Sequence, residues 1–436
     1  NQPALHWWML LYSKEDKKKM TEIQKDHKVY KIALLVAFAC VLQIAESLIP
    51  HPIPGLRLGL ANMLTLTAMV VLGFRYALEV AVLRTILSAF IMGTFMSPTF
   101  ILSFSGAVLS TLIMGFFYWL SGVHRRFRLS IIGISIIGAF CHNLVQLHLA
   151  YLLLVKHEGI FVFLPWLSIG AVASGWVVGV VAGGVCRRLA ENPQQDRLAK
   201  IPAAGEDSMI RHYVPGSSLL HRLPAEIKIS AVFVLALAVL FFSNFWFYLG
   251  LLFSLIFLAA LSQTSFSFFV SKTKRYSSLL AVAFLLPVFF NSGATTVATI
   301  ASFKISYEGL CTGSLFASRI LFLLIASCLL MRTTSPEELT RGLARLLLPL
   351  RYLGVSQKRV ATILSLAWTA IPHVWETTRG AILAANLKKA KNLRNLLPLL
   401  SNLIAMLYLN TESENKLWEK AASSRNKDTL NPAPTQ

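Results

Sequence analysis

The sequence is poor in charged residues, above all in acidic ones. Only 14% of its 436 residues are charged, and Asp and Glu together number 20. A soluble protein typically has about 25% charged residues. Hydrophobic residues make up 55% of the chain, the mean hydropathy is +0.62, and many apolar runs are long enough to cross a bilayer. The sequence therefore predicts an all-α, polytopic helical membrane protein.

Several catalytic motifs are missing as well. The chain has no GxxxxGK[ST] segment to bind the phosphates of ATP and no DDxxD run to hold Mg²⁺ against a pyrophosphate. It has no HExxH segment and no recognisable Ser/His/Asp set. Its five cysteines show no CxxC spacing, which favours packing over metal binding or disulfides. We expect no enzyme activity, no catalytic residue, no metal site and no cofactor.

Basic residues are abundant, and the net charge is +21. They cluster between apolar runs, and the positive-inside rule explains this pattern without a nucleic-acid partner. Alternation from a Lys-rich N-terminus predicts a multi-pass membrane protein with both termini in the cytoplasm. The basic clusters are KKK (17–19), HRRFR (124–128), CRR (186–188), SKTKR (271–275) and KKAKNLR (388–394).

Two blocks of apolar runs are separated by a polar, Pro- and Gly-containing segment that is typical of a linker. The first block predicts spans near 31–49, 58–73, 77–91, 99–121, 130–154 and 161–185. The second predicts spans near 227–243, 246–262, 277–292, 309–331, 358–372 and 395–410. The expected domains are a cytoplasmic tail (1–29), a six-helix membrane domain (30–186), a cytoplasmic linker (187–210), a second membrane domain (211–426) and a tail (427–436).

From residue 332 onward, apolar and charged residues interleave at helical spacing, which predicts helices that lie against a membrane face or a protein partner. In SPEELTRGLARLL, Ser335 is a candidate cap, Pro336 suits the first turn, and two glutamates suit the positive helix end. One apolar stripe is expected, formed by Leu339, Leu343, Leu346 and Leu347.

Polar residues inside the first block are candidates for a binding site. Such groups are costly in a bilayer and tend to face the bundle interior or a cavity. His142 and Gln146 are four residues apart and share a helix face, with Asn143 beside it, whereas His148 falls on another face. The alternative is that these groups only join neighbouring helices. The candidate substrate-binding residues are Glu46, Arg57, Asn62, Arg84, His142, Asn143 and Gln146; Glu46 and Arg84 alternatively pair with each other.

The first half resembles a known family. The segments are PIPGLRLGLAN (52–62), LRTILS (83–88), GTFMSPTFILSFSGAVLS (93–110) and GAFCHNLVQ (138–146). They resemble the Gx transporter family, also labelled heptaprenyl diphosphate synthase component I and similar to the substrate-binding S components of energy-coupling-factor transporters. The resemblance implies that residues 30–185 bind a small organic solute such as a vitamin.

The second half is similar to the transmembrane T component of the same transporters, a family that includes the cobalt-uptake permease. The similarity begins at YVPGSSLLHRLPAEIKI (213–229) and includes YEGL (307–310), Arg319, 333–355 and AIPHVWE (370–376). It implies cytoplasmic ATPase subunits as partners.

In that family two Ala-Arg-Gly motifs dock onto the ATPases. The corresponding segments here read AANLKK (384–389) and AASSRN (421–426), so Lys388 replaces one arginine while Arg425 keeps the other. Lysine lacks the planar fork of arginine, and the flanking small residues have changed, so ATPase coupling is diverged or absent. We assign the coupling role to Glu337, Glu338, Lys388 and Arg425.

The leading hypothesis is an S–T fusion in which the first half binds the solute and the second couples to ATPases. The S half then reorients in a form of alternating access. The alternatives are a non-catalytic scaffold or regulatory subunit for isoprenoid or quinone metabolism, and an enzyme of prenyl metabolism. The expected partners are ATPase subunits, a small organic solute and the lipid bilayer, with no nucleic acid.

Overall fold

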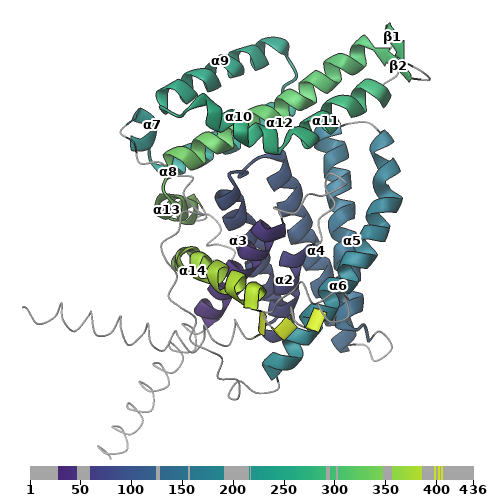
Figure 1. The fold of residues 1–436 in the computed structure, drawn as a ribbon, viewed down its shortest axis with the longest axis vertical. Coiled ribbons are helices and arrows are strands. Elements are labelled where there is room, and N and C mark those ends of the chain that lie inside the picture. The colour runs from purple at the N-terminus through teal and green to yellow at the C-terminus, as the bar shows by residue number, and fades with distance from the viewer. Residues whose placement is uncertain are drawn as a thin grey trace, which may run out of the picture.

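The structure is a computed structural model of the 436-residue chain (Figure 1). It describes residues 28–46, 59–123, 128–155, 158–190, 216, 218–290, 295–300, 303–346, 356–384 and a few positions between 397 and 405.

The N-terminal half folds into a bundle of helices, here called the N-terminal bundle. Each expected span of this half, from 31–49 to 161–185, coincides with one of its helices except for a few residues at the ends. The bundle comprises Lys28–Glu46, α2 (Leu60–Val71), α3 (Phe74–Met92), α4 (Pro98–Val123), α5 (Ile131–Ala150), the π-helix η2 (Tyr151–Val155), the 3₁₀-helix η3 (Glu158–Phe163) and α6 (Leu164–Ala190).

The first helix lies at the centre of this bundle. Residues 32–41 of Lys28–Glu46 are at most 3% exposed on every side. A helix that is apolar all round can be stable only where neighbours or lipid cover every face.

Helices α5 and α6 are in close contact because two glycines of α6 face α5. A Cβ atom added at Gly175 would lie 2.7 Å from the Cα of Ile136, and one added at Gly179 would lie 2.7 Å from the Cα of Ile132. Small residues four apart allow two helix backbones to approach closely in a membrane. Any larger side chain at either position therefore pushes the two helices apart.

The described C-terminal half begins with one short helix and continues as a layer of helices, here called the C-terminal layer (α8 to α12). Its elements are α7 (Leu219–Arg222), α8 (Ala225–Phe241), α9 (Phe245–Leu261), α10 (Phe266–Arg275), α11 (Ser277–Phe290), β1 (Thr296–Ile300), β2 (Phe303–Ser306), α12 (Tyr307–Thr333), α13 (Pro336–Leu346) and α14 (Gln357–Ala384). Five described helices are long and apolar enough to cross a membrane: Lys28–Glu46, Pro98–Val123, Ile131–Leu153, Glu158–Ala190 and Tyr307–Thr333.

Two elements of this half were not expected. Helix α10 occupies the basic segment that the sequence suggested as a loop. Strands β1 and β2 form an antiparallel hairpin, with Thr299 opposite Lys304 and a bulge between Thr296 and Ala298. The β-branched residues of TVATI explain this hairpin, because they pack well on an extended backbone.

Helix α12 is joined to α8 at two levels. The Lys228 amine donates to the carbonyl of Thr333 (2.8 Å), at the end of α12. Further along, the buried Arg319 donates to the hydroxyl of Tyr248 (3.0 Å) and to the carbonyl of Phe242 (3.3 Å), where α8 turns into α9. Lys228 thus satisfies a backbone carbonyl at the C-terminal end of α12, and Arg319 satisfies one at the C-terminal end of α8; a cation is favoured at both ends by the helix dipole.

Helix α13 is amphipathic, as the sequence predicts, and carries a reciprocal cap. The amide of Glu338 donates to the Ser335 hydroxyl (3.3 Å), and the amide of Ser335 donates to the Glu338 carboxylate (3.2 Å). This is a capping box. Leu339 and Leu343 are buried, but Leu346 is exposed because α13 ends there. Leu347 lies outside the described residues.

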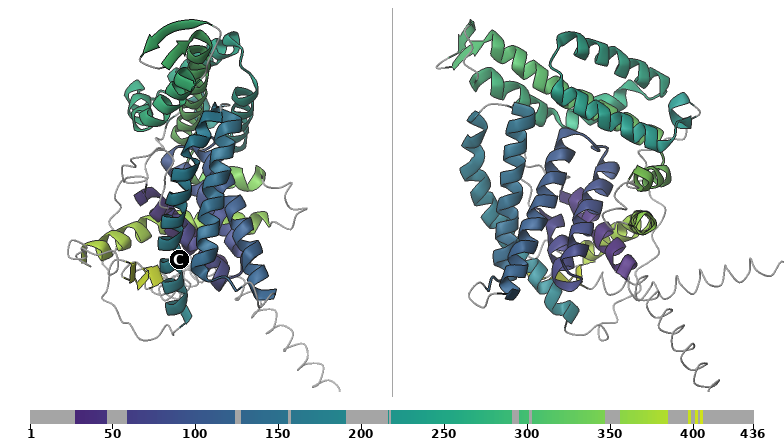
Figure 2. Two further views of the ribbon diagram at one scale, coloured as in Figure 1. Left: turned by 90° about the vertical axis from the view of Figure 1, so that its right-hand side faces the viewer. Right: turned by 180° about the vertical axis from the view of Figure 1, so that it is seen from behind.

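The two halves cross steeply. The C-terminal layer lies across one end of the N-terminal bundle, while α13 and α14 lie along the flank of the bundle (Figures 1 and 2). At the crossing, the Ser327 hydroxyl of α12 donates to the carbonyl of Gly93 at the end of α3 (3.0 Å). A second apolar cluster joins Leu147 and Ile160 of the bundle to Phe316 and Ile320 of α12.

Candidate functional site

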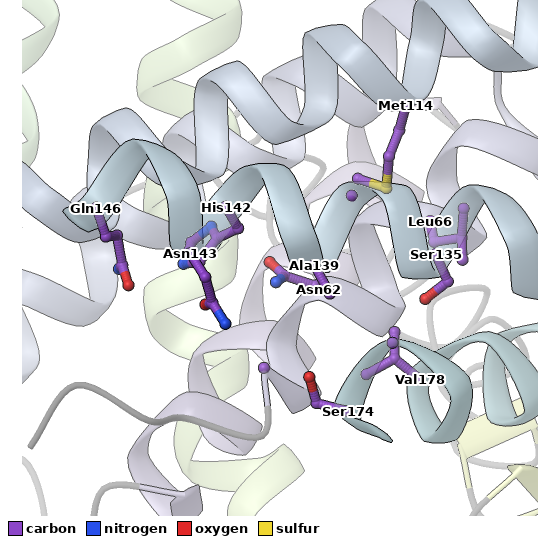
Figure 3. Close-up of a pocket in the computed structure, with 13 residues that line it drawn as sticks. Asn62, Leu66, Met114, Ser135, Ala139, His142, Asn143, Gln146, Ser174 and Val178 are labelled. Carbon is purple, nitrogen blue, oxygen red and sulfur yellow. The ribbon is translucent and has the colours of Figure 1, made fainter. Parts of the chain in front are cut away.

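A cavity inside the N-terminal bundle gathers most of the polar residues that the sequence singles out (Figure 3). It lies between α2, α4, α5 and α6, and its volume is about 40 Å³. It is lined by Gly59, Asn62, Leu66, Met114, Ser135, Gly138, Ala139, His142, Asn143, Gln146, Ser174, Gly175 and Val178.

Helix α5 supplies the largest polar side chains. His142, Asn143 and Gln146 line the cavity from consecutive turns of this helix (Figure 3). The Asn143 amide donates to the carbonyl of Leu167 in α6 (3.0 Å), which fixes its orientation. His148 is exposed, and its ring nitrogen lies 2.9 Å from the carbonyl of Leu144, so it stays outside the cavity.

A glycine of α4 makes room for this row. A Cβ atom added at Gly106 would lie 2.9 Å from the His142 ring and 3.2 Å from Cγ of Gln146. Contacts below 3.0 Å require a neighbour to shift. The absence of a side chain at Gly106 therefore sets where His142 and Gln146 lie against α4.

Asn62 of α2 lines the cavity and is held from behind by Arg84 of α3. The Arg84 guanidinium donates to Asn62 Oδ1 (2.5 Å), Thr65 Oγ1 (3.1 Å) and Gln43 Oε1 (3.3 Å). All three nitrogens of Arg84 are occupied, and the side chain is 4% exposed. Arg84 therefore lies behind the cavity wall and orients Asn62, where the sequence suggested a direct contact with the solute.

Glu46 also lies behind the wall. Its carboxylate accepts from the backbone amides of Gly59 (2.8 Å) and Leu60 (3.2 Å) at the start of α2. These amides lack partners within the helix, so Glu46 acts as a cap supplied by another helix. Glu46 and Arg84 form no ion pair with each other in the described part of the chain, so the alternative of a direct pair is wrong.

Some lining residues were missed from the sequence. Ser135 and Ser174 contribute hydroxyl groups, and Met114 and Val178 contribute apolar surface. Single serines in apolar helices are common, so their residue type alone did not distinguish these two. The small-residue spacing of Gly175 and Gly179 was the one available signal, because it marks the helix pair that carries both serines.

The cavity walls are polar but neutral. Among the described lining residues the polar groups are amides, hydroxyls and one imidazole, with no carboxylate, ammonium or guanidinium. The described residues contain no group of three His, Cys, Asp or Glu side chains that could hold a metal ion. The arrangement suits an uncharged solute that donates and accepts hydrogen bonds.

The proposed coupling residues are only partly described. Glu338 belongs to the capping box of α13, so its carboxylate is engaged with its own helix. Glu337 lies in the first turn of α13. The other two coupling residues, Lys388 and Arg425, lie outside the described residues, as does the substrate-binding candidate Arg57.

Comparison with known proteins gives a different match for each half. Residues 35–185 match the family described as heptaprenyl diphosphate synthase component I, and residues 216–425 match the family described as cobalt transport protein.

Curated relatives carry the name energy-coupling factor transporter transmembrane protein EcfT. The protein of Listeria innocua serovar 6a is 32% identical over 41% of this chain and 68% of its own length. That of Clostridium kluyveri is 30% identical over 43% of this chain and 74% of its own length. That of Bacillus subtilis (strain 168) is 32% identical over 39% of this chain and 65% of its own length. Together with the long apolar helices, these relationships show that the chain is a multi-pass membrane protein of the energy-coupling factor transporter transmembrane protein (EcfT) family.

Proposed function

We propose that the chain is a fused transporter subunit. Its N-terminal bundle (within 30–186) binds a small, uncharged polar solute, and its C-terminal half (within 211–426) is the T component that couples to cytoplasmic ATPase subunits. The observation that carries the proposal is the cavity formed by Asn62, His142, Asn143 and Gln146, in the same chain as a T component.

The size of the cavity supports a closed, solute-free arrangement. A volume of about 40 Å³ holds only a few water molecules, whereas pockets for small molecules measure about 300–1,000 Å³. A vitamin-sized solute therefore requires the cavity walls to separate. Because Gly175 and Gly179 hold α5 and α6 together, we expect α2 and α4 to move.

The steep crossing of the two halves supports a reorientation step. The bundle and the C-terminal layer cannot both stand upright in one bilayer while they cross in this way (Figures 1 and 2). In the proposed cycle the bundle stands upright to receive solute from outside and lies against α12 to release it. Helices α13 and α14 transmit ATPase movement to this step, in the bacterial cytoplasmic membrane with both termini in the cytoplasm.

A second candidate is a non-catalytic scaffold for isoprenoid or quinone metabolism. It is favoured by the match of residues 35–185 to heptaprenyl diphosphate synthase component I. In that case the cavity holds a prenyl or quinone compound, and no ATPase is needed.

The test is to extract the full chain gently and identify by mass spectrometry the small molecule that co-purifies. The solute should be lost from His142→Ala and retained by the matched control His148→Ala, because only His142 lines the cavity. Co-purification of an ATPase with a P-loop favours the transporter. An empty site in the unmodified protein, with no thermal stabilisation by riboflavin or menadione, contradicts solute binding. A bound prenyl or quinone compound without an ATPase favours the scaffold.

A further inference from the structure

We propose that Glu79 of α3 and Arg359 of α14 form a releasable latch that holds the N-terminal bundle against the coupling helices in the arrangement described here. The inference rests on the proposed function, in which the bundle turns relative to the C-terminal half. In this scheme the contact between Glu79 and Arg359 opens first, and the bundle pivots on the contact between Ser327 and Gly93.

The latch is a two-pronged ion pair between the two halves. Arg359 Nε donates to Glu79 Oε1 (3.1 Å), and Arg359 Nη2 donates to Glu79 Oε2 (2.9 Å). The guanidinium also lies 5.3 Å from the ring centre of Tyr76, one turn earlier on α3. The amine of Lys28, at the start of the first helix, lies 5.9 Å from the same ring. Two cations therefore meet one aromatic ring beside one carboxylate, which sets the register of α14 on the bundle.

Helix α3 contacts the C-terminal half near both of its ends. Glu79 lies close to its start, whereas Gly93 at its end accepts the hydrogen bond from Ser327 of α12 (3.0 Å). The two contacts are separated by about 21 Å along the helix axis, at 1.5 Å per residue. A bundle that turns relative to α12 cannot keep both contacts, so one of them has to open.

Burial decides which contact opens. The side chains of Arg359 and Glu79 are 33% and 21% exposed, so both charges regain water when they separate. Partly exposed ion pairs contribute little net stability and open at little cost. Ser327 is 0% exposed, and opening its bond would leave a buried hydroxyl without its acceptor and the Gly93 carbonyl with only the long contact to Cys328 Sγ (4.0 Å). The ion pair is therefore the releasable contact, and the end of α3 at Gly93 is the pivot.

The same helix leads from the latch to the cavity. Arg84 lies five residues after Glu79 on α3 and orients Asn62 in the cavity wall (2.5 Å). A movement of α14 that pulls on Glu79 is therefore transmitted through α3 to the solute site. Glu79 and Arg359 are positioning residues in this scheme, because neither lines the cavity.

The experiment measures the distance between the halves in the full chain, reconstituted in lipid nanodiscs. Spin labels are attached to cysteines that replace the exposed Trp119 of α4 and Phe253 of α9. The native Cys141, Cys186 and Cys311 are changed to serine. Cys40 and Cys328 are kept because they are buried. This readout needs neither solute nor ATPase, so its failure is distinguishable from failure of the proposed function.

We expect Arg359→Glu and Glu79→Arg each to increase the fraction of molecules with separated halves by roughly 5- to 30-fold, because attraction is lost and repulsion gained. The double variant E79R/R359E restores the original distribution. Arg359→Gln, which perturbs folding less, gives a smaller increase in the same direction. Raising the salt concentration to about 1 M increases the separated fraction of the unmodified protein, because the pair is partly exposed.

The matched control is the ion pair between Arg345 of α13 and Glu226 of α8, which lies entirely within the C-terminal half. Arg345→Glu should leave the distance between the halves unchanged. An unchanged distribution in Arg359→Glu, in Glu79→Arg and in Arg359→Gln would overturn the latch. So would a double variant that fails to restore the distribution, because the effect would then not be electrostatic.

Discussion

Each half of the protein buries one arginine in the middle of an apolar helix, and the two arginines are used differently. In the N-terminal bundle, Arg84 donates to the side-chain oxygens of Gln43, Asn62 and Thr65, and Asn62 forms part of the cavity wall. In the C-terminal half, Arg319 donates to a backbone carbonyl and to the Tyr248 hydroxyl at the turn between α8 and α9.

The two arginines differ in whether the oxygens that they contact have another donor nearby. The single proton of the Tyr248 hydroxyl lies within hydrogen-bond distance of two carbonyls, those of Val239 (2.9 Å) and Phe242 (3.2 Å), so the Phe242 carbonyl has a second donor within reach besides Arg319. The oxygens around Arg84 belong to the side chains of Gln43, Asn62 and Thr65. Among the described residues, Arg84 is the donor to all three. A network of this kind ties the cavity wall to α3, whereas the network around Arg319 only closes a turn.

The largest expected effect comes from removing these arginines. Arg84→Met leaves one buried oxygen (Thr65) and two partly buried oxygens (Gln43 and Asn62) without this donor, so we expect the free energy of unfolding to fall by about 3 kcal/mol. Arg319→Met should cost only about 1 kcal/mol, since the Tyr248 proton can still reach the Phe242 carbonyl and the substitution also removes the buried Arg319 Nη1, which has no hydrogen-bond partner among the described residues. SDS unfolding in mixed micelles measures both values. Equal losses of unfolding free energy in the two variants would show that the two arginines have the same structural role.

Glycines at helix contacts give the next largest effect. Gly175→Ala places a Cβ atom 2.7 Å from the Ile136 Cα, and Gly313→Ala places one 2.4 Å from the carbonyl oxygen of Phe284 in α11. Backbone cannot move aside easily, so we expect each variant to lose about 1–3 kcal/mol. Only Gly175→Ala should also reduce solute binding, because Gly175 lines the cavity.

The controls for these variants are glycines that have no neighbour within 4 Å of an added Cβ atom. Gly183→Ala in α6 and Gly250→Ala in α9 meet this condition. Both should be neutral or slightly stabilising, because alanine favours the helix by about 1 kcal/mol. Losses in the controls as large as those in the contact variants would remove the distinction between packed and open positions.

The smallest expected effect concerns helix caps. Ser335→Ala removes one bond of the capping box of α13, and Ser130→Ala removes the bond to the Gly133 amide in α5 (3.1 Å). Each should cost about 1 kcal/mol. Hydrogen exchange of the first-turn amides measures the loss. Faster exchange should stay within the first turn of the affected helix, and spreading to the other half would contradict the local role of these caps.

The helices were predictable because their apolar runs and breaks are encoded locally. The spacing of His142 and Gln146 gave a shared face, and the structure places both on the cavity. The role of Glu46 was not predictable, because the amides of Gly59 and Leu60 that it accepts from reach it only after two helices pack. The contacts of Arg84 were hidden for the same reason, since its three partners lie on other helices.

The crossing of the two halves was equally hidden from the sequence. It depends on contacts such as Ser327 with Gly93 and Arg359 with Glu79, which join residues more than 200 positions apart. Helical periodicity marks which face is buried but does not state which partner covers it. The β1–β2 hairpin escaped prediction because its short β-branched run lies between two apolar helices, α11 and α12.

The short helices α8 and α9 have a consequence for the surrounding lipid. Each contains 17 residues, which corresponds to about 25 Å at 1.5 Å per residue. The hydrocarbon core of a typical bilayer is about 30 Å thick. The exposed aromatic rings of Phe241, Phe245 and Trp246 lie where these two helices meet. A membrane that keeps this end covered must become thinner beside α8 and α9, and the cost of that mismatch falls as the acyl chains become shorter. We therefore expect lipids with shorter acyl chains to stabilise this half of the protein.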